Sequence, residues 1–341
     1  MSAALAIASV EADRHETGPQ HPERPARLRA VEHGIDAAEL GDAAVRIEVR
    51  PAAREDLARV HSELYLDALA QLAAVGGGSL DPDTPVSVGS WDTAVLGAGL
   101  GLSAIDALQR GEAAAAFVAP RPPGHHATRA RGMGFCLLNN VAVAAAALAH
   151  AGNRVLVVDW DVHHGNGTQD IFWDDPRVMY VSTHEWPAYP GTGRARETGG
   201  PGAPGSTVNV PLPPGATGDV LLAAFDEVAA PAVDGFAPDW VLISAGFDAH
   251  RDDPLAGLDL SSGDFADLTA RVAAFAPRPG RLVAFLEGGY DLDALARSVT
   301  ATVATLAGAD RRPEPATSGG PGRVAVAQAA QQRARSGGDL L

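Results

Sequence analysis

The chain has 341 residues, of which 46% are hydrophobic, and this length allows one large α/β domain with a sizeable core. Its formal net charge is −16, which argues against a nucleic-acid-binding protein because such proteins present a basic face. The single cysteine, Cys136, excludes an intrachain disulfide framework and a cysteine zinc knuckle.

Predicted helices and strands alternate along the chain. In chain order they are a helix over 91–109, a strand over 115–119, a helix over 139–151, strands over 155–158 and 178–182, a helix over 219–233, and strands over 240–244 and 282–286. The strand sequences are apolar without alternation, which is typical of a parallel sheet covered on both faces. The pattern therefore predicts an α/β fold with a central parallel sheet and helices on both faces.

Three segments interrupt this alternation. Residues 186–216 hold many Gly and Pro and are predicted to form a long loop. Residues 309–341 are polar and rich in Pro and Gly, so we expect a catalytic domain over 1–308 followed by a flexible C-terminal tail. The stretch GAGLGL at 97–102 resembles a dinucleotide-binding loop, but its spacing is wrong and no strand precedes it, so its glycines are interpreted as sites of close helix packing.

Four predicted strands end in polar side chains of complementary chemistry. These side chains are His125 and His126 after 115–119, Asp159, Asp161, His163 and Asn166 after 155–158, Asp248 after 240–244, and Tyr290 after 282–286. In parallel α/β sheets, ligands bind beyond the carboxyl ends of the strands. The sequence therefore predicts one functional site at this edge of the sheet.

The stretch VLVVDWDVHHGNG at 155–167 predicts a metal site. If the chain stays extended past Val158, then Asp159, Asp161 and His163 point to one face, because strand side chains alternate. Asp161 and His163 are then placed to bind one metal ion, with Asp248 as the third ligand. Two carboxylates and one imidazole suit zinc or ferrous iron, and three protein ligands are typical of a catalytic site.

The adjacent histidines His125 and His126 follow the rigid turn RPPG and suit proton transfer beside a metal-bound water. Each imidazole needs an orienting acceptor, and Asp159 and Asn166 are the candidates. Tyr290 follows two glycines, which let the backbone turn sharply and bring its hydroxyl toward the site, where a phenol can stabilise an oxyanion.

Together these motifs resemble the zinc-dependent histone deacetylase superfamily, which includes class II histone deacetylases, bacterial deacetylase-like amidohydrolases and acetylpolyamine amidohydrolases. The resemblance extends to about residue 308. The matching motifs are HPERPARL (21–28), RPPGHHA (121–127), GFCLLNN (134–140), DWDVHHGNGTQ (159–169), STHEWPAYPGTG (182–193), AGFDAHRDDPLAG (245–257) and EGGY (287–290).

The resemblance implies the arginase/deacetylase fold and a role for each matching residue. It implies zinc at Asp161, His163 and Asp248, His126 as the main general base and acid, His125 as its electrostatic partner paired with Asp159, and Tyr290 as the hydroxyl that binds the acetyl carbonyl. It implies Phe135 and Tyr189 as aromatic walls, Gly134 as a backbone acceptor, Asp83 as a rim carboxylate, and Arg27 at the inner acetate cavity. It also implies a structural potassium ion near Asp159, Asp161, His163, Ser182 and His184.

The activity implied is hydrolysis of an N-acetylated amine, with acetyl-lysine in a peptide or protein favoured. An acetylpolyamine hydrolase needs an acidic gate seven positions after the last zinc aspartate, and Leu255 at that position is neutral, although Asp252 and Asp253 lie close by. Asn166 stands where class I members have aspartate, which is the class II pattern. An arginase-like binuclear manganese hydrolase and a non-catalytic metal-binding module are the alternatives outside this chemistry.

Partners are expected to be acetylated peptides or small acylated amines, with no nucleic acid and no membrane. No apolar run is long enough to span a bilayer, and the N-terminus lacks the pattern of a signal peptide, so a cytoplasmic location is expected. A homo-oligomer is compatible with the sequence.

Overall fold

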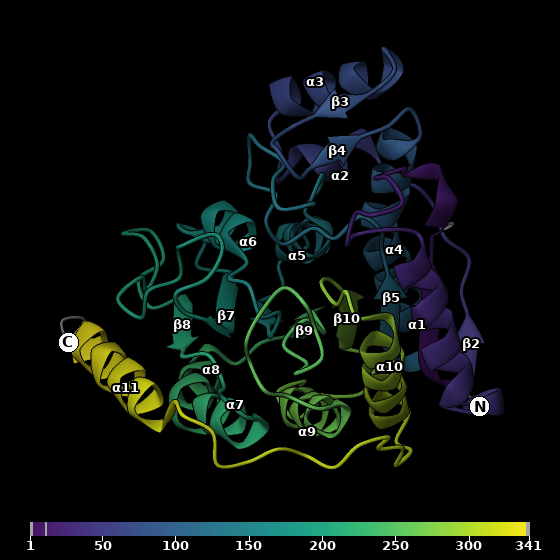
Figure 1. The fold of residues 1–341 in the computed structure, drawn as a ribbon. Helices are drawn as coiled ribbons and strands as arrows, with labels where there is room; N and C mark the ends of the chain where they lie inside the picture. The colour runs from purple at the N-terminus through teal and green to yellow at the C-terminus, as the bar shows by residue number, and fades with distance from the viewer. Residues whose placement is uncertain (1–2, 11, 339–341) are drawn as a thin grey trace.

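The computed structural model describes residues 3–10 and 12–338. Its centre is an eight-stranded sheet in which all neighbouring strands are parallel, in the order β2–β1–β5–β10–β9–β6–β7–β8 (Figure 1). The strands are β1 (Ala3–Ser9), β2 (Ala44–Arg46), β5 (Ala113–Ala119), β6 (Val155–Asp159), β7 (Val178–Glu185), β8 (Thr207–Leu212), β9 (Trp240–Ala245) and β10 (Leu282–Leu286). A separate antiparallel ribbon joins β3 (Gly78–Ser79) and β4 (Pro85–Val86).

The central strands β6, β9 and β10 are buried along their whole length. β6 reads VLVVD and β9 reads WVLISA, and every residue of both is buried. Continuous burial requires cover on both faces of the sheet, which is why these sequences do not alternate between polar and apolar residues. Each of the five predicted strands lies within one of the observed strands β5, β6, β7, β9 and β10, which confirms the α/β fold with a central parallel sheet.

Helices cover both faces of this sheet. The helices are α1 (Ala26–Ala37), α2 (Arg54–Ala58), α3 (Glu63–Ala74), α4 (Ser90–Gln109), α5 (Asn140–His150), α6 (Asn166–Phe172), α7 (Gly218–Ala224), α8 (Ala230–Phe236), α9 (Ser262–Ala273), α10 (Leu292–Leu306) and α11 (Arg323–Gly338). α4 and α5 pack side by side on one face, whereas α1, α10, α9 and α7 form a row against the other (Figure 1). The predicted helix over 219–233 comprises α7, a π-helical segment (Phe225–Ala229) and part of α8. No helix within the described residues is long and apolar enough to cross a membrane.

The glycines of GAGLGL lie inside α4 and permit close packing, as predicted. A Cβ at Gly99 would lie 1.9 Å from the carbonyl oxygen of Arg50, and a Cβ at Gly101 would lie 2.4 Å from Cε1 of Phe285. Any side chain at either position would overlap a neighbouring element. These glycines therefore serve the core and not a nucleotide.

The predicted loop over 186–216 is wrong for its last part, which contains β8. This strand reads TVNVPL and pairs with β7 at the edge of the sheet. Pro211 is tolerated because an edge strand has one side with no ladder hydrogen bonds to lose. The asparagine and the proline made this segment look like a loop.

The sequence predicts a flexible segment after residue 308. The part of this tail that the structure describes, residues 309–338, is instead held against the domain. Residues 309–322, which we call the C-terminal strap, run past α9 and α7 and lead into α11, which packs against β8 (Figure 1). The amide of Thr317 donates a hydrogen bond to Oδ1 of Asp264 at 2.9 Å. Side chains of other elements thus hold this Pro- and Gly-rich segment, and composition cannot show such bonds.

Candidate active site

Four adjacent strands carry the predicted site residues. β5, β10, β9 and β6 are consecutive, parallel strands of the sheet, so the segments that follow them leave from the same edge. The carboxyl ends of neighbouring parallel strands form the usual binding crevice of such sheets. The sheet order, which the sequence did not provide, therefore brings the four strand ends together.

Asp161, His163 and Asp248 form one cluster, which we call the metal-ligand cluster. One ligand atom from each lies within 4.8 Å of the others. Nδ1 of His163 is 3.2 Å from Oδ1 of Asp161 and 3.1 Å from Oδ2 of Asp248. The backbone holds the second oxygens, because Gly288 donates to Asp161 at 2.8 Å and Val162 donates to Asp248 at 3.0 Å. Each carboxylate therefore keeps one oxygen turned toward the histidine.

The charge and space at this cluster fit a divalent cation. Burial lowers the pKa of His163, but the two carboxylates outweigh this effect and raise it well above its ordinary value. Burial, with repulsion from Asp161, raises the pKa of Asp248 to about 7. Two buried carboxylates need a positive charge between them, which a bound metal would supply. Gly288 provides the space that this cluster needs, because a Cβ at that position would lie 2.0 Å from Oδ2 of Asp248.

The chain after β6 is not extended, in contrast to the prediction. β6 ends at Asp159, and the backbone bends over residues 161–163. Within this bend the amide of Asp161 donates to Oδ1 of Asp159 at 3.1 Å, and the amide of His163 donates to Oδ1 of Asp161 at 2.9 Å. Asp159 consequently does not join the metal-ligand cluster. A strand rule of alternating side chains cannot describe such successive aspartate turns.

The two adjacent histidines have different partners. Nδ1 of His125 lies 3.1 Å from Oδ2 of Asp159, and Nδ1 of His126 lies 2.8 Å from Oδ1 of Asn166. Burial lowers the pKa of His125, but Asp161 and Asp159 outweigh it and raise the pKa to about 10. Burial, together with the charges on His125 and on the cluster histidine, holds the pKa of His126 well below its usual range. The surroundings therefore raise the pKa of one imidazole and lower that of the other.

Glu287 is a buried residue of the site that the sequence reasoning missed. Its Oε2 accepts hydrogen bonds from the amides of Gly124 at 2.6 Å and His125 at 3.1 Å, so it fixes the turn that carries the histidine pair. Burial raises the pKa of this carboxyl group to about 7, against the favourable charge of His125. Glu287 directly follows the predicted strand over 282–286, so the same strand-end rule could have found it.

Tyr290 lies at the end of β10 with its ring between two neighbours. The ring of Phe135 meets it edge-on, with centroids 5.6 Å apart, and the guanidinium of Arg27 lies 4.9 Å from its centroid. Arg27 also donates from Nε to the carbonyl of Gly289 at 2.7 Å. Burial raises the pKa of the Tyr290 phenol well above its ordinary value, although Arg27 opposes this effect. The phenol is thus a neutral hydrogen-bond donor.

Gly134 and Tyr189 lie against His126, the histidine that pairs with Asn166, whereas the ring of Phe135 contacts His21 and Tyr290. The Tyr189 ring stands at 89° to the ring of His126, with centroids 5.0 Å apart, and Tyr189 is 41% exposed. Gly134 has φ +55°, and a Cβ there would lie 2.7 Å from Cδ2 of His126. Tyr189 therefore borders the approach to His126, and Phe135 borders Tyr290.

The predicted rim residues Asp83 and Leu255 are both exposed. The amide of Asp83 donates to Oδ1 of Asp81 at 3.2 Å, and Nε2 of His21 bonds the carbonyl of Asp83 at 3.1 Å. Burial, and then the neighbouring Asp81 carboxylate, raises the pKa of Asp83. The rim therefore offers a pair of carboxylates on one side and a neutral side chain on another element.

Ser182 and His184 lie next to β6 on β7. Ser182 is in register with Asp159, and both residues are fully buried. The Ser182 hydroxyl lies 2.9 Å from Nδ1 of His184, whose Nε2 lies 2.9 Å from the carbonyl of Gly193. The structure thus brings Ser182 beside Asp159 but turns the imidazole toward Gly193.

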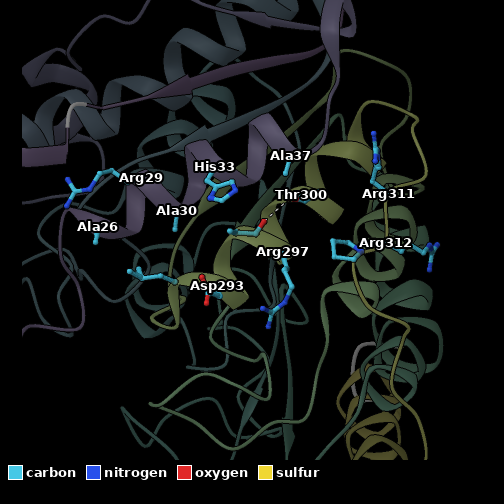
Figure 2. A pocket seen from close by; sticks show the side chains of 13 residues that line it. Ala26, Arg29, Ala30, His33, Ala37, Asp293, Arg297, Thr300, Arg311 and Arg312 are labelled. Atoms are coloured by element: carbon cyan, nitrogen blue, oxygen red, sulfur yellow. Dashed lines mark hydrogen bonds between the residues drawn. The ribbon is translucent and has the colours of Figure 1, made fainter.

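Cys136 adjoins the histidine pair, because its sulfur and ligand atoms of His125 and Glu287 all lie within 4.8 Å of one another. Burial raises the pKa of the Cys136 thiol well above its ordinary value, so the side chain is a small apolar group beside the site. A groove of about 700 Å³ lies between α1 and α10, with Arg29 and Arg312 near its opposite ends (Figure 2). Its arginines are engaged elsewhere, as with Arg297, which pairs with Asp252 at 2.8 Å.

Comparison with known proteins agrees with this geometry. Residues 21–306 match the histone deacetylase domain. The chain belongs to the histone deacetylase family. It is 42% identical over 314 residues to a protein of Archaeoglobus fulgidus named probable deacetylase, covering 88% of this chain and 86% of that protein. It is also 42% identical over 278 residues to a histone deacetylase-like amidohydrolase of Pseudomonas aeruginosa, covering 79% and 72%.

A solved structure supports the same assignment. The crystal structure of the HDA15 HD domain is similar to this chain with a TM-score of 0.88 and 35% sequence identity, covering 100% of this chain and 99% of that one. Membership of the histone deacetylase family confirms the resemblance based on the sequence motifs and the arginase/deacetylase fold that it implied. Family membership also supports a hydrolase that acts as a deacetylase.

Proposed function

We propose that this histone deacetylase family member is a zinc-dependent amidohydrolase that removes acetyl groups from N-acetylated amines, with acetyl-lysine in peptides or proteins as its substrate class. The observation that carries the proposal is the metal-ligand cluster with the ring of His126 beside it, 6.0 Å from the His163 ring between centroids, at the sheet edge where Tyr290 also follows a neighbouring strand. Ferrous iron is the alternative metal, since the same donor set accepts it. Asp161, His163 and Asp248 would hold the ion.

When bound, the metal would act as a Lewis acid on the acetyl carbonyl and lower the pKa of the attacking water. His126 takes the proton from that water and later gives it to the leaving amine. Its low pKa keeps it neutral before the reaction, and Asn166 orients Nδ1 without adding a negative charge. Asp161 and Asp159 raise the pKa of His125, which favours its cationic form next to the site of the negative transition state.

Tyr290 donates its hydroxyl proton in a hydrogen bond to the acetyl oxygen as that oxygen becomes negative. A donor that acts mainly in the transition state contributes about 10²–10³-fold to kcat. The raised pKa of the phenol keeps its proton in place for this role. The product is acetate and a free amine.

The substrate chain is proposed to pass between the rings of Phe135 and Tyr189, with the carbonyl of Gly134 accepting the substrate amide. Asp83 at the rim would accept a hydrogen bond from the substrate backbone. These roles agree with the exposure of Asp83 and Tyr189 and with the contacts of Tyr189 with His126 and of Phe135 with Tyr290.

The rim favours a peptide over a polyamine. Leu255 is exposed and neutral. Asp252 pairs with Arg297 at 2.8 Å, and Asp253 is buried with its carboxylate on backbone amides. Neither aspartate is free to receive a second ammonium group at the rim. The Asp81 and Asp83 pair is the feature that would favour a polyamine.

A structural potassium ion is a further part of the proposal. It would take oxygen ligands around Asp159, Asp161, His163, Ser182 and His184. The support is the register of Asp159 with Ser182 and the full burial of both. Loss of thermal stability on exchange of potassium for a larger organic cation would test it.

The decisive experiment compares kcat/KM of the zinc-loaded protein on an acetyl-lysine peptide and on an N-acetylpolyamine. A higher value for the peptide is the expected result. A higher value for the polyamine would refute the substrate class but keep the chemistry. Turnover of neither would point to other acylated amines or to a module without catalysis.

The variant His126→Ala separates the last two interpretations. It should retain the metal but lose turnover of any substrate that wild type hydrolyses, because it removes the base and leaves the metal-ligand cluster intact. Equal activity in this variant would contradict the assigned base. Metal content measured on the same sample shows whether the cluster has survived.

A further inference from the structure

Asp253 lies buried behind the turn that carries Tyr290. Its Oδ2 accepts hydrogen bonds from the amide of Tyr290 at 2.6 Å and from the amide of Asp291 at 3.3 Å. Its Oδ1 accepts from the amide of Leu255 at 3.0 Å. The residue is only 7% exposed, so these amides stand in place of the water that a carboxylate would otherwise bind.

These bonds join two segments that are far apart in the sequence. One is the rim loop over 249–257, which carries exposed Leu255, and the other is the turn between β10 and α10. The side chain of Asp291 begins α10 by accepting a hydrogen bond from the amide of Ala294 at 2.8 Å. Asp253 therefore binds the rim loop, the Tyr290 backbone and the start of a helix at one point.

The turn needs such an anchor because it is built on glycine. Gly289 has φ +119°, a region open to glycine and costly for other residues. The backbone freedom that lets the chain turn at Gly289 would also let the Tyr290 side chain occupy several positions. Arg27 holds the carbonyl side through Gly289 at 2.7 Å, and Asp253 holds the amide side through Tyr290.

The neighbouring residue Asp252 makes different contacts. Asp252 turns outward, pairs with Arg297 at 2.8 Å and keeps about half of its side chain exposed. Its carboxylate thus faces a surface arginine, whereas the carboxylate of Asp253 faces the Tyr290 turn. Two consecutive acidic residues of one loop therefore offer an internal comparison between an anchor and a surface ion pair.

We propose that Asp253 is a positioning residue that sets the Tyr290 hydroxyl against the acyl carbonyl and couples its place to the rim at Leu255. This inference rests on the proposed deacetylation. Asp253 is buried behind the turn, and its effect on the chemistry would pass through the Tyr290 backbone that it holds. Its effect should therefore appear in kcat, because the hydroxyl contributes mainly in the transition state.

The test is Asp253→Asn, which keeps the shape but leaves one oxygen for two sets of amide donors. Misplacement of a reacting group by about 1 Å can cost about 10²-fold, so we expect kcat on an acetyl-lysine peptide to fall about 10- to 100-fold. KM should change less than about threefold, because the substitution leaves the rings of Phe135 and Tyr189 in place and reaches the rim only through the backbone amide of Leu255. Metal content should equal that of wild type.

The same substitution in the Tyr290→Phe background shows whether Asp253 acts through the hydroxyl. There the additional loss should be less than about threefold, since no hydroxyl remains to be positioned. An equal fold loss in both backgrounds, or an Asp253→Asn enzyme with wild-type kcat, would overturn the proposal. If the Asn variant does not fold, Asp253→Ser keeps one acceptor and should give the same dependence on the background.

Asp252→Asn is the matched control, one residue away and of the same chemistry. It should keep kcat within about twofold, because an exposed ion pair contributes little to the structure around it. A loss in this control equal to that of Asp253→Asn would also overturn the proposal. Failure of wild type to hydrolyse the peptide would refute the proposed function instead, so the two failures are distinguishable.

Discussion

Replacing Asn166 with aspartate would give His126 the same kind of partner as His125. In this structure Asp161 and Asp159 raise the pKa of His125 to about 10, whereas burial and the charges of His125 and His163 hold the pKa of His126 well below its usual range. Nδ1 of His126 and Oδ1 of Asn166 are 2.8 Å apart. An opposite charge at such a distance changes a pKa by about 1–3, which corresponds to about 1.4–4 kcal/mol. Asn166→Asp should therefore raise the pKa of His126 by about that amount.

The assay is the pH profile of kcat/KM on an acetyl-lysine peptide. His126 accepts a proton only when neutral, so a higher pKa moves the acidic limb to higher pH. The rate below the midpoint should fall about tenfold each time the pKa rises by about one. Asn166→Ala is the control, because it removes the acceptor without adding a charge and should not move the limb upward. An unmoved limb in the Asp variant, with the metal retained, would refute the assignment of His126 as the base.

Four further outcomes follow from the geometry. Asp161→Asn should abolish metal binding, measured as metal per chain, because it removes one of two carboxylates; full metal content would contradict the ligand set. Removing the metal with a chelator should lower Tm, since a ligand at 100 times its Kd contributes about 2.7 kcal/mol; an unchanged Tm would argue against a site in the cluster. Gly134→Ala should lower kcat/KM, because φ +55° disfavours alanine by about 1–2 kcal/mol and its Cβ would press on His126; wild-type kinetics would contradict this crowding. Burial raises the pKa of Glu314, but hydrogen bonds from His250 and Ser262 outweigh this effect and lower the pKa to about 2. The ionised Glu314 therefore stabilises the folded state fully above about pH 4.5, and this stabilisation is lost as pH falls toward 2. Glu314→Gln should thus lower the free energy of unfolding by about 1–3 kcal/mol at pH 7, with a smaller difference at pH 3 in urea titrations; equal differences at both pH values would contradict the role of the charge.

The inner strands and the chemistry at their ends were predictable because both follow local rules. A run such as VLVVD is apolar at every position until the sheet ends, and its first polar residue marks the edge. The rule placed His125, Asp161 and Tyr290 correctly at strand ends. Their neighbourhood depends on the order of strands, and no local pattern specifies that β10 and β9 lie between β5 and β6.

The parts that sequence reasoning missed depend on contacts between distant segments. Asp253 resembles its neighbour Asp252 in the sequence, and only the turn at Tyr290 makes one an anchor and the other a surface charge. The strap is held in the same way, because Glu314 bonds Nε2 of His250 at 2.8 Å. The composition of a segment does not show which hydrogen-bonding partners from other elements hold it, and the fixed position of the strap depends on those partners.

Helix α11 has a consequence for how the molecule behaves in concentrated solution. β8 ends the sheet, and Arg333 of α11 donates to carbonyls at its start, from Nη2 to Gly205 at 3.0 Å and from Nη1 to Thr207 at 3.4 Å. Val326, in the same helix, has a fully buried side chain. Bare strand edges recruit strands from other molecules. A chain that ends at residue 306, where the matched family domain ends, would therefore expose the edge of β8. We expect self-association of such a chain to be the first effect of losing α11.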